Sequence, residues 1–265
     1  MIDAVDRQFR RLRRLVRFAA VVVRAWRNVR RYRGRDPELI ARARSLHDWS
    51  RAVLRALDVQ VQMQGRPPQG GLLVSNHLSY LDIFVYSSAL PCAFVSKSEV
   101  AKWPIIGPFA RFSGTIFVRR EQRSNSASAK QSIVAYLAAG VPVVLFPEGT
   151  TTDGREVLPF HSSMLQAAID AGQSVTACAI RYELSDGDPA TEVCWWGNMT
   201  LPPHVWNLLG KRAIRAKVIF GEPIQGISDR KSLSDAAWHS VVAMHETLAN
   251  HEAVPARAVA PTSDC

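Results

Sequence analysis

The chain has 265 residues, 47% of them apolar, which is enough to bury a core, so disorder of the whole chain is excluded. The formal net charge of +10 equals the excess of twelve arginines over two aspartates in residues 1–35, so the remaining chain is balanced. The four cysteines contain no CxxC pair, which argues against a zinc site or a thiol redox centre, and no segment reads as a signal peptide. We therefore expect a reducing, cytosolic setting.

Residues 7–33 have the pattern of a basic amphipathic helix. Most of the arginines lie outside one apolar stripe at helical spacing, which is made by Phe9, Leu12, Val16, Ala19, Val23 and Trp26. Such a helix suits the surface of an anionic bilayer, because the stripe can enter the headgroup region while the arginines meet lipid phosphates. The apolar run 18–23 is far shorter than the roughly 20 residues of a spanning helix, so we expect peripheral docking and no transmembrane helix.

Two other interpretations of this helix remain open. Its stripe could pack on the protein's own core and leave the arginines in water, or the arginines could bind nucleic acid. Nucleic acid is disfavoured as a partner, because the arginines are interleaved with apolar residues and the rest of the chain has no signature of a nucleic-acid-binding fold.

A second helix is expected from Asp36-Pro37, which reads as an N-cap followed by proline at the first helical position, to about Leu57. Residues 1–57 are thus predicted to form basic N-terminal helices that anchor the protein to a membrane surface. A separate domain is predicted over residues 58–251. Residues 252–265 are rich in Ala, Pro and small polar residues and are predicted to be a disordered tail.

Beyond Asp58, short apolar runs alternate with helical patterns. Strands are predicted at residues 59–63, 72–74, 93–95, 115–118, 141–146, 175–180, 193–196 and 216–220. Helices are predicted at residues 126–139, 164–171 and 233–250, the last with Ser232 and Asp235 at the spacing of a capping box. This alternation is typical of an α/β domain, and we predict a mixed, largely parallel sheet flanked by helices.

Asn76 and His77 directly follow the predicted strand 72–74, and Asp82 lies five residues beyond the histidine. Open α/β sheets bind ligands at the carboxyl ends of their strands. A histidine held by a carboxylate at one ring nitrogen has a fixed tautomer, and its other nitrogen can take a proton from a hydroxyl. The sequence has no GxSxG nucleophile elbow, so that hydroxyl would belong to the substrate. Taken alone, the pair also fits a structural histidine and a helix cap.

Two further segments place polar residues at strand ends. The segment from Gly114 ends in Arg119-Arg120, and arginine can bind a phosphate or carboxylate through two nitrogens. The run that ends in Phe146 continues as Pro147-Glu148-Gly149-Thr150, in which Glu148 can accept hydrogen bonds from substrate hydroxyls. Taken separately, these segments also fit a solvated charge pair and a structural turn.

In order and approximate spacing, the three segments resemble the motifs of the bacterial 1-acylglycerol-3-phosphate (lysophosphatidate) acyltransferase family. The motifs are Asn-His-x-x-x-x-Asp, Phe-Val-x-Arg after a glycine, and Phe-Pro-Glu-Gly-Thr, within residues 70–182. The resemblance implies that His77 is the general base for the acceptor hydroxyl and that Asp82 orients it. It also implies a substrate site made by Asn76, Arg120, Glu148, Gly149 and Thr150, with Arg120 as the phosphate ligand.

The same resemblance implies an acyltransferase domain at residues 58–251 and an acyl thioester, either acyl-CoA or acyl carrier protein, as co-substrate. No further cofactor and no metal ion are expected. Membrane lipids are the expected partners, and the expected location is the cytoplasmic face of the inner (plasma) membrane, with peripheral attachment.

Some positions depart from the family's pattern. The family commonly has arginine after Phe-Pro-Glu-Gly-Thr, where this chain has Thr151, and lysine at the position of His161. Fewer cations favour a larger or less anionic headgroup. Lysophosphatidate remains the expected acceptor, with another lysolipid such as lyso-ornithine lipid or lysophosphatidylcholine as the alternative. A noncatalytic membrane-surface protein that only binds lipid is the alternative of another class, and the intact His77, Asp82 and Glu148 argue against it.

Overall fold

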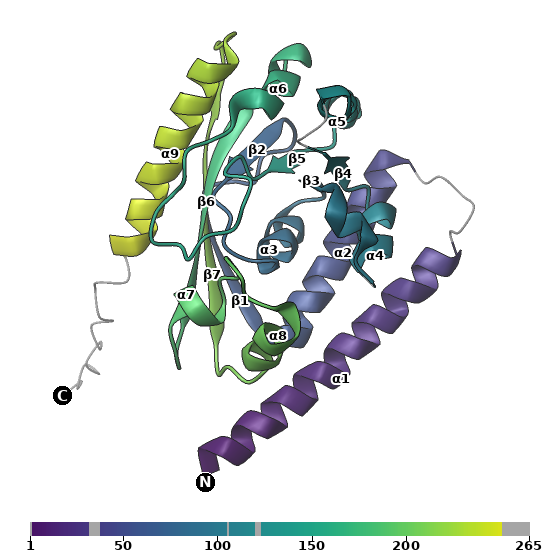
Figure 1. The fold of residues 1–265 in the computed structure, drawn as a ribbon, viewed down its shortest axis with the longest axis vertical. Helices are drawn as coiled ribbons and strands as arrows, with labels where there is room; N and C mark the ends of the chain where they lie inside the picture. The colour runs from purple at the N-terminus through teal and green to yellow at the C-terminus, as the bar shows by residue number, and fades with distance from the viewer. Residues whose placement is uncertain (1, 32–37, 105, 120–122, 251–265) are drawn as a thin grey trace, which may run out of the picture.

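The computed structural model describes residues 2–31, 38–104, 106–119 and 123–250. Within these ranges one sheet has the strand order β1-β7-β6-β2-β5-β3-β4 (Figure 1). Its strands are β1 (Val59–Gln64), β2 (Leu72–Ser75), β3 (Ala93–Lys97), β4 (Ile116–Val118), β5 (Val143–Leu145), β6 (Val175–Leu184) and β7 (Ile214–Ile224). Neighbouring strands run parallel except for the antiparallel pair β6 and β7. The predicted mixed, largely parallel sheet is confirmed.

Helices cover both faces of the sheet, and each face has its own core cluster (Figure 1). One cluster is built mainly with α5 (Arg123–Ala138), α6 (Gln166–Asp170) and α9 (Arg230–Asn250), and the other with α2 (Leu39–Leu57), α3 (Leu81–Ala89) and α8 (Leu201–Leu209). The central strands contribute to both clusters. In β2, Leu72 and Val74 belong to the first cluster and Leu73 to the second. Burial on both faces explains why such strands read as uninterrupted apolar runs.

Other short helical segments within the described residues connect these elements, namely η1 (Ser98–Lys102), α4 (Ile106–Phe112), η2 (Ser162–Met164) and α7 (Pro189–Glu192). The strand predicted at residues 193–196 is wrong, because this segment is a loop after α7. Its backbone N–H groups do not enter the sheet. Those of Val193 and Cys194 donate to the carbonyl of Pro189, and that of Trp195 donates to the carbonyl of Leu78.

The start of α9 also differs from the prediction. The carboxylate of Asp229 accepts the backbone N–H of Ser232 at 2.8 Å, and the helix begins at Arg230. The predicted cap at Ser232 is therefore wrong by three residues. The predicted start at Asp36-Pro37 and the predicted tail at residues 252–265 lie outside the described residues.

Helix α1 (Ile2–Arg31) lies along α2, α4 and α8 (Figure 1). Its contacts show that an arginine-bearing face is turned toward the domain. Arg14 is only 1% exposed. Its guanidinium donates to the carbonyl of Lys211 at 2.7 Å and to Asp58 Oδ2 at 3.1 Å. Arg13 and Arg17 also pair with Asp58. Asp58 follows α2 with φ +54°, a left-handed conformation that aspartate tolerates, and this turn presents its carboxylate to α1.

The apolar stripe of α1 points away from the domain. Phe9, Leu12 and Val16 are 67%, 60% and 61% exposed. Trp26, at the end of the stripe, instead packs edge-on against Phe109 of α4 with ring centroids 5.8 Å apart. The interpretation in which the stripe packs on the protein's own core is therefore wrong for most of its length. None of the helices in the described ranges is long and apolar enough to cross a membrane.

Candidate active site

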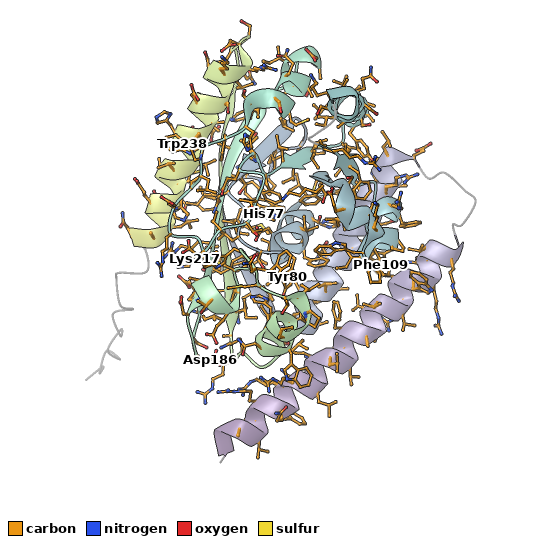
Figure 2. All side chains as sticks on the ribbon, in the orientation of Figure 1. His77, Tyr80, Phe109, Asp186, Lys217 and Trp238 are labelled. Atoms are coloured by element: carbon orange, nitrogen blue, oxygen red, sulfur yellow. The ribbon has the colours of Figure 1, made fainter. Side chains whose placement is uncertain are left out.

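Three neighbouring strands bring polar residues to one edge of the sheet. Asn76 and His77 follow β2, the segment 146–150 follows β5, and Lys97 ends β3. Since β5 lies between β2 and β3 and all three run parallel, their carboxyl ends lie side by side. His77 lies near the middle of the molecule in Figure 2.

Asp82 holds the His77 ring by its Nδ1 atom. The distance from His77 Nδ1 to Asp82 Oδ2 is 2.7 Å, and the same oxygen accepts the backbone N–H groups of Leu78 (2.7 Å) and Ser79 (3.0 Å). Asp82 is fully buried in the first turn of α3. Because an ionised carboxylate only accepts hydrogen bonds, we assign the ring hydrogen to Nδ1. The other ring nitrogen, Nε2, is then free to take a proton from a hydroxyl.

The backbone around His77 is also held from several directions. Its N–H donates to Glu148 Oε1 at 3.2 Å, and its carbonyl accepts the N–H of Thr152 at 2.9 Å. The carbonyl of Leu78 accepts the N–H of Trp195 at 2.8 Å. The loop at residues 193–196, where the sequence predicts a strand, thus fixes the backbone next to His77 instead.

The ring of His77 stacks on Phe146, with centroids 4.0 Å apart and an interplanar angle of 7°. One side of His77 opens into a cavity of about 630 Å³. Apolar and aromatic side chains make much of its wall, including Val95, Trp103, Leu145, Met164, Trp195 and Trp196. Polar groups complete it, including Lys97, Thr150, Thr151 and His161. Such a cavity suits a molecule with an apolar chain and a polar head.

Glu148 lies behind the wall of this cavity. It is 4% exposed, and it is not among the described residues that line the cavity. Burial raises the pKa of its carboxyl group to about 8, and the nearby charge of Asp82 adds to this, while the hydrogen bond from the backbone of His77 opposes it. At neutral pH the side chain is therefore mostly an uncharged acid. Its Oε2 atom has no hydrogen-bond partner among the described residues.

The remaining predicted substrate residues fall into different places. Gly149 and Thr150 line the cavity. Asn76 is fully buried, and its side-chain amide exchanges two 2.9 Å hydrogen bonds with the backbone of Ile180 in β6. Arg120 lies outside the described residues. A substrate role for Asn76 and Glu148 stays a prediction, and the structure gives both of them partners within the protein.

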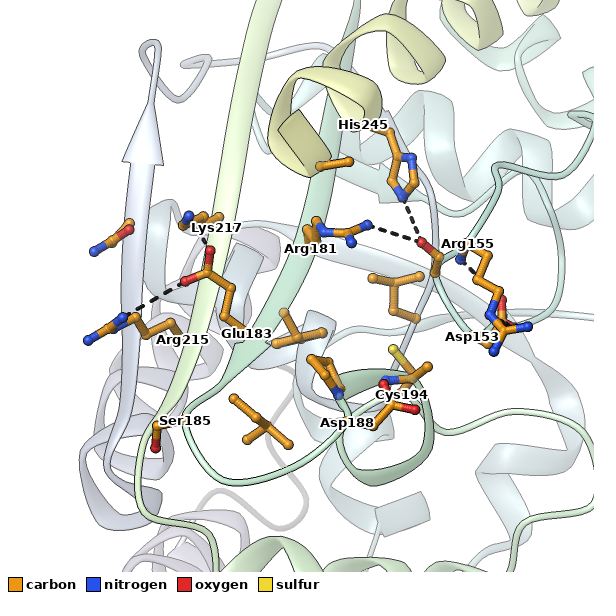
Figure 3. Close-up of a pocket in the computed structure, with 18 of the residues that line it drawn as sticks. Asp153, Arg155, Arg181, Glu183, Ser185, Asp188, Cys194, Arg215, Lys217 and His245 are labelled. Carbon is orange, nitrogen blue, oxygen red and sulfur yellow. Dashed lines mark hydrogen bonds and ion pairs between the residues drawn. The ribbon is translucent and has the colours of Figure 1, made fainter. Parts of the chain in front are cut away.

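A larger cavity of about 1040 Å³ lies elsewhere, with His77 not among the residues that line it. Figure 3 shows Glu183 beside Arg215 and Lys217, with which it pairs, and shows Arg181 and His245 pointing to the carbonyl of Gly154, to which both donate. Because His77 lines the smaller cavity and is not among the residues that line this one, we take the smaller cavity as the candidate site.

The buried cysteines do not supply a nucleophile for His77. Cys92, Cys178 and Cys194 are free thiols with at most 2% exposure. Burial raises the pKa of both Cys92 and Cys194 to about 12, so their thiols stay protonated and unreactive. This agrees with the expectation that the attacking group belongs to the substrate.

Sequence reasoning did not assign a role to Tyr182, whose hydroxyl donates to Asp82 Oδ1 at 2.6 Å. The two residues are a hundred positions apart, so no local spacing reveals the contact. The position of Tyr182 near the carboxyl end of β6 is the one weak indication of such a role. Because β6 pairs in parallel with β2, this end lies beside the edge of the sheet that carries His77.

Comparisons with known proteins agree with this arrangement. Residues 58–181 match the model of the Acyltransferase family. The chain is 35% identical to the 1-acyl-sn-glycerol-3-phosphate acyltransferase of Neisseria meningitidis serogroup B over 80% of its own length and 83% of the relative. It is 38% identical to the lyso-ornithine lipid O-acyltransferase of Brucella abortus over 69% of its own length and 75% of that protein.

The fold has a match among solved structures. The crystal structure of PlsC, the 1-acyl-sn-glycerophosphate acyltransferase of Thermotoga maritima, superposes with a TM-score of 0.60 over 89% of this chain and 98% of that one, at 21% identity. At this identity the match supports the fold alone. Together with the sequence relatives and the matching family model, it leads to one conclusion. The chain belongs to the lysophosphatidate acyltransferase family and is an acyltransferase of lipid metabolism.

Proposed function

We propose that this acyltransferase moves a fatty acyl group from an acyl thioester, carried by CoA or acyl carrier protein, to the hydroxyl of 1-acylglycerol-3-phosphate. The product is phosphatidate. The observation that carries the proposal is the His77–Asp82 pair, which leaves Nε2 of a cavity-lining histidine as a free base. The largely apolar wall suits acyl chains.

In this mechanism His77 acts as general base and Asp82 as its orienting group. Nε2 takes the proton from the acceptor hydroxyl while the hydroxyl oxygen bonds to the thioester carbon. The carbon–sulfur bond then breaks, and the departing thiolate receives the proton from His77. His77 is thereby restored, and no acyl group is attached to the enzyme at any stage.

Replacement of the base tests this proposal. His77→Ala should lower kcat for phosphatidate formation roughly 100-fold or more. His239→Ala is the matched control, because His239 is an exposed histidine on α9 whose hydrogen bond goes to the carbonyl of Asp235 in the same helix. If His77→Ala kept the wild-type rate, or if the wild-type protein made no acylated product from matched lysolipids and thioesters, the proposal would be wrong.

Lyso-ornithine lipid is the second candidate acceptor, and Thr151 is the observation that favours it. Thr151 lines the cavity at the position where relatives commonly have a phosphate-binding arginine. Several relatives are named lyso-ornithine lipid O-acyltransferases. Equimolar lysophosphatidate and lyso-ornithine lipid in one assay separate the candidates, and faster formation of ornithine lipid would favour the second. Thr151→Arg should raise kcat/KM for lysophosphatidate relative to lyso-ornithine lipid about tenfold, because a guanidinium binds phosphate at two points.

We also propose that the protein docks peripherally on the cytoplasmic face of the inner membrane through α1. The exposed apolar stripe of α1 supports this proposal. Phe9, Leu12 and Val16 are neighbouring apolar side chains, and their exposure to water is unfavourable. Arg24 and Arg27 are exposed on the same helix and can meet lipid phosphates. The acceptor is itself a membrane lipid, so docking brings the enzyme to its substrate.

A further inference from the structure

The carboxylate of Asp82 accepts hydrogen bonds on both of its oxygens, and they come from two different parts of the fold. Oδ2 accepts from His77 Nδ1 and from the backbone N–H groups of Leu78 and Ser79, all within one short segment. Oδ1 accepts from the hydroxyl of Tyr182 at 2.6 Å. Tyr182 lies on β6, which pairs with β2 in the sheet.

We infer that Tyr182 is a positioning residue for the proposed acyl transfer, which acts through Asp82 to hold the plane of the carboxylate and thereby the ring of His77. The inference rests on the proposed function. The three donors on Oδ2 hold that oxygen in place but do not stop the carboxylate from turning about it. The hydrogen bond from the Tyr182 hydroxyl to Oδ1 prevents this rotation. Since Tyr182 belongs to the sheet, the contact also fixes the His77–Asp82 pair relative to the strands that shape the cavity.

The hydroxyl of Tyr182 is suited to this task because it remains a donor. The side chain is 2% exposed, and this burial raises its pKa well above the usual value, with the neighbouring charge of Asp82 adding to the effect. It therefore stays protonated whether His77 is neutral or has taken the substrate's proton. Tyr182 lines the larger cavity and is not among the described residues that line the cavity beside His77, so its contact with the candidate site is the hydrogen bond to Asp82.

Tyr182→Phe removes this hydroxyl and little else. We expect kcat to fall about tenfold, because a small misplacement of a catalytic group is costly, while KM for the thioester and for the lysolipid stays the same. Tyr136→Phe is the matched control. Its hydroxyl is buried in the core cluster on the other face of the sheet, where it donates to the carbonyl of Gly114 at 2.8 Å. An unchanged kcat in Tyr182→Phe, or an equal loss in both variants, contradicts the inference.

A double-mutant cycle tests whether Tyr182 acts through Asp82. In an Asp82→Asn background, which has already lost the charged carboxylate, Tyr182→Phe should change kcat less than twofold. If it lowers kcat by the same factor in both backgrounds, the hydroxyl contributes by another route and the inference is wrong. Thermal unfolding of all variants shows which losses come from folding.

A measurement without substrate keeps the test valid if Tyr182→Phe folds poorly. Incorporation of 3-fluorotyrosine at position 182 keeps the hydroxyl but strengthens it as a donor. The downfield proton resonance of His77 Nδ1–H, assigned by its loss in His77→Ala, should shift when Tyr182 is fluorinated. An unchanged resonance contradicts the inference. A shifted resonance in an enzyme that transfers no acyl group would instead contradict the proposed function, so the two failures are distinguishable.

Discussion

His77 is restrained at its ring and at its backbone, and these restraints come from different elements. The ring is held by Asp82 and by stacking on Phe146, and the backbone is held by Glu148 and by the N–H of Thr152. A side chain that is held in this way seldom adopts other orientations. Glu148 is the unusual member of the group. It is a buried acid, and its Oε2 atom has no hydrogen-bond partner among the described residues.

Glu148 is predicted to lower the stability of the protein as pH rises. Its pKa is about 8 in the folded protein against an ordinary value of 4.5, so between these values the folded state holds the extra proton. The stabilisation that comes from this bound proton is fully present below the ordinary pKa. It is lost as pH rises through the pKa of Glu148 in the folded protein. Glu148→Gln removes this titration. We expect the free energy of unfolding of the variant, relative to wild type, to rise by about 1 kcal/mol per pH unit over this interval.

Urea unfolding at several pH values between these two pKa values measures the difference. Glu222→Gln, at an exposed position on β7, is the control and should give a difference that does not depend on pH. A Glu148→Gln difference that stays constant or shrinks as pH rises would show that the carboxyl group titrates normally.

At the scale of elements, arginines join α1 to α8. Arg10 and Arg11 donate to the carbonyls of Gly210 and Trp206, and Arg14 is the buried member of the group. The last carbonyls of a helix have no partners within it, and the end of α8 carries the negative end of the helix dipole. The guanidinium of Arg14 reaches the carbonyls of Leu209 and Lys211 there and binds Asp58 as well. Burial alone would raise the pKa of Asp58, but the guanidinium of Arg14 beside it lowers the pKa below its usual range. The ion pair between Arg14 and Asp58 should therefore persist at neutral pH and be lost only in acid.

Arg14→Ala is expected to loosen α1 from the domain by about 2 kcal/mol, because it leaves the buried carbonyls of Leu209 and Lys211 without their charged donor. It also removes one of the arginines that pair with Asp58. Amide hydrogen exchange along α1 measures this local opening directly. Arg24→Ala is the control on the exposed side of the same helix and should change exchange by less than about 0.5 kcal/mol. Equal exchange in the two variants would mean that Arg14 does not hold the helix.

The sequence predicts strands that are buried on both faces better than strands that border a cavity or loops that pack on the core. Strands β2 and β5 are buried on both faces, so their apolar runs are unmistakable. The predictions for β6 and β7 are too short, because Arg181, Glu183 and Arg215 alternate with apolar residues where the sheet borders the larger cavity. The loop at 193–196 is apolar because Val193 and Cys194 are buried in the core cluster that contains Leu78. An apolar run alone does not distinguish such a loop from a strand.

The same distinction applies to the site. The pairing of His77 with Asp82 lies within six residues and follows from the motif, and the meeting of the β2 and β5 ends follows from a parallel sheet. The contact between Tyr182 and Asp82 depends on how β6 aligns with β2, which no local pattern encodes. The helical pattern of α1 likewise predicts an apolar stripe but not the direction in which it points. That direction depends on Asp58 and on the end of α8, which are far away in the sequence.

For the whole molecule, the position of the charge is as important as its amount. The N-terminal segment carries the entire net charge of +10, but part of it is already engaged with the domain through Arg13, Arg14 and Arg17. These arginines are less available to lipid phosphates than a count suggests. Docking on a membrane should therefore depend mainly on the apolar stripe, with the exposed arginines as a smaller contribution that salt weakens.

Replacement of Phe9, Leu12 and Val16 together by serine tests the docking surface of the whole enzyme. Burial of each of these side chains contributes on the order of 1–2 kcal/mol, so the variant should bind anionic vesicles about 100-fold more weakly. Flotation with phosphatidylglycerol-containing vesicles measures this loss. A control with Gln8, Ala20 and Asn28 changed to serine alters exposed positions of α1 and keeps the large apolar side chains of the stripe. If the stripe variant binds vesicles as well as this control does, α1 does not face the membrane. If the stripe variant loses acylation on vesicles but keeps it on detergent-dispersed lysolipid, the stripe gives the enzyme access to its substrate.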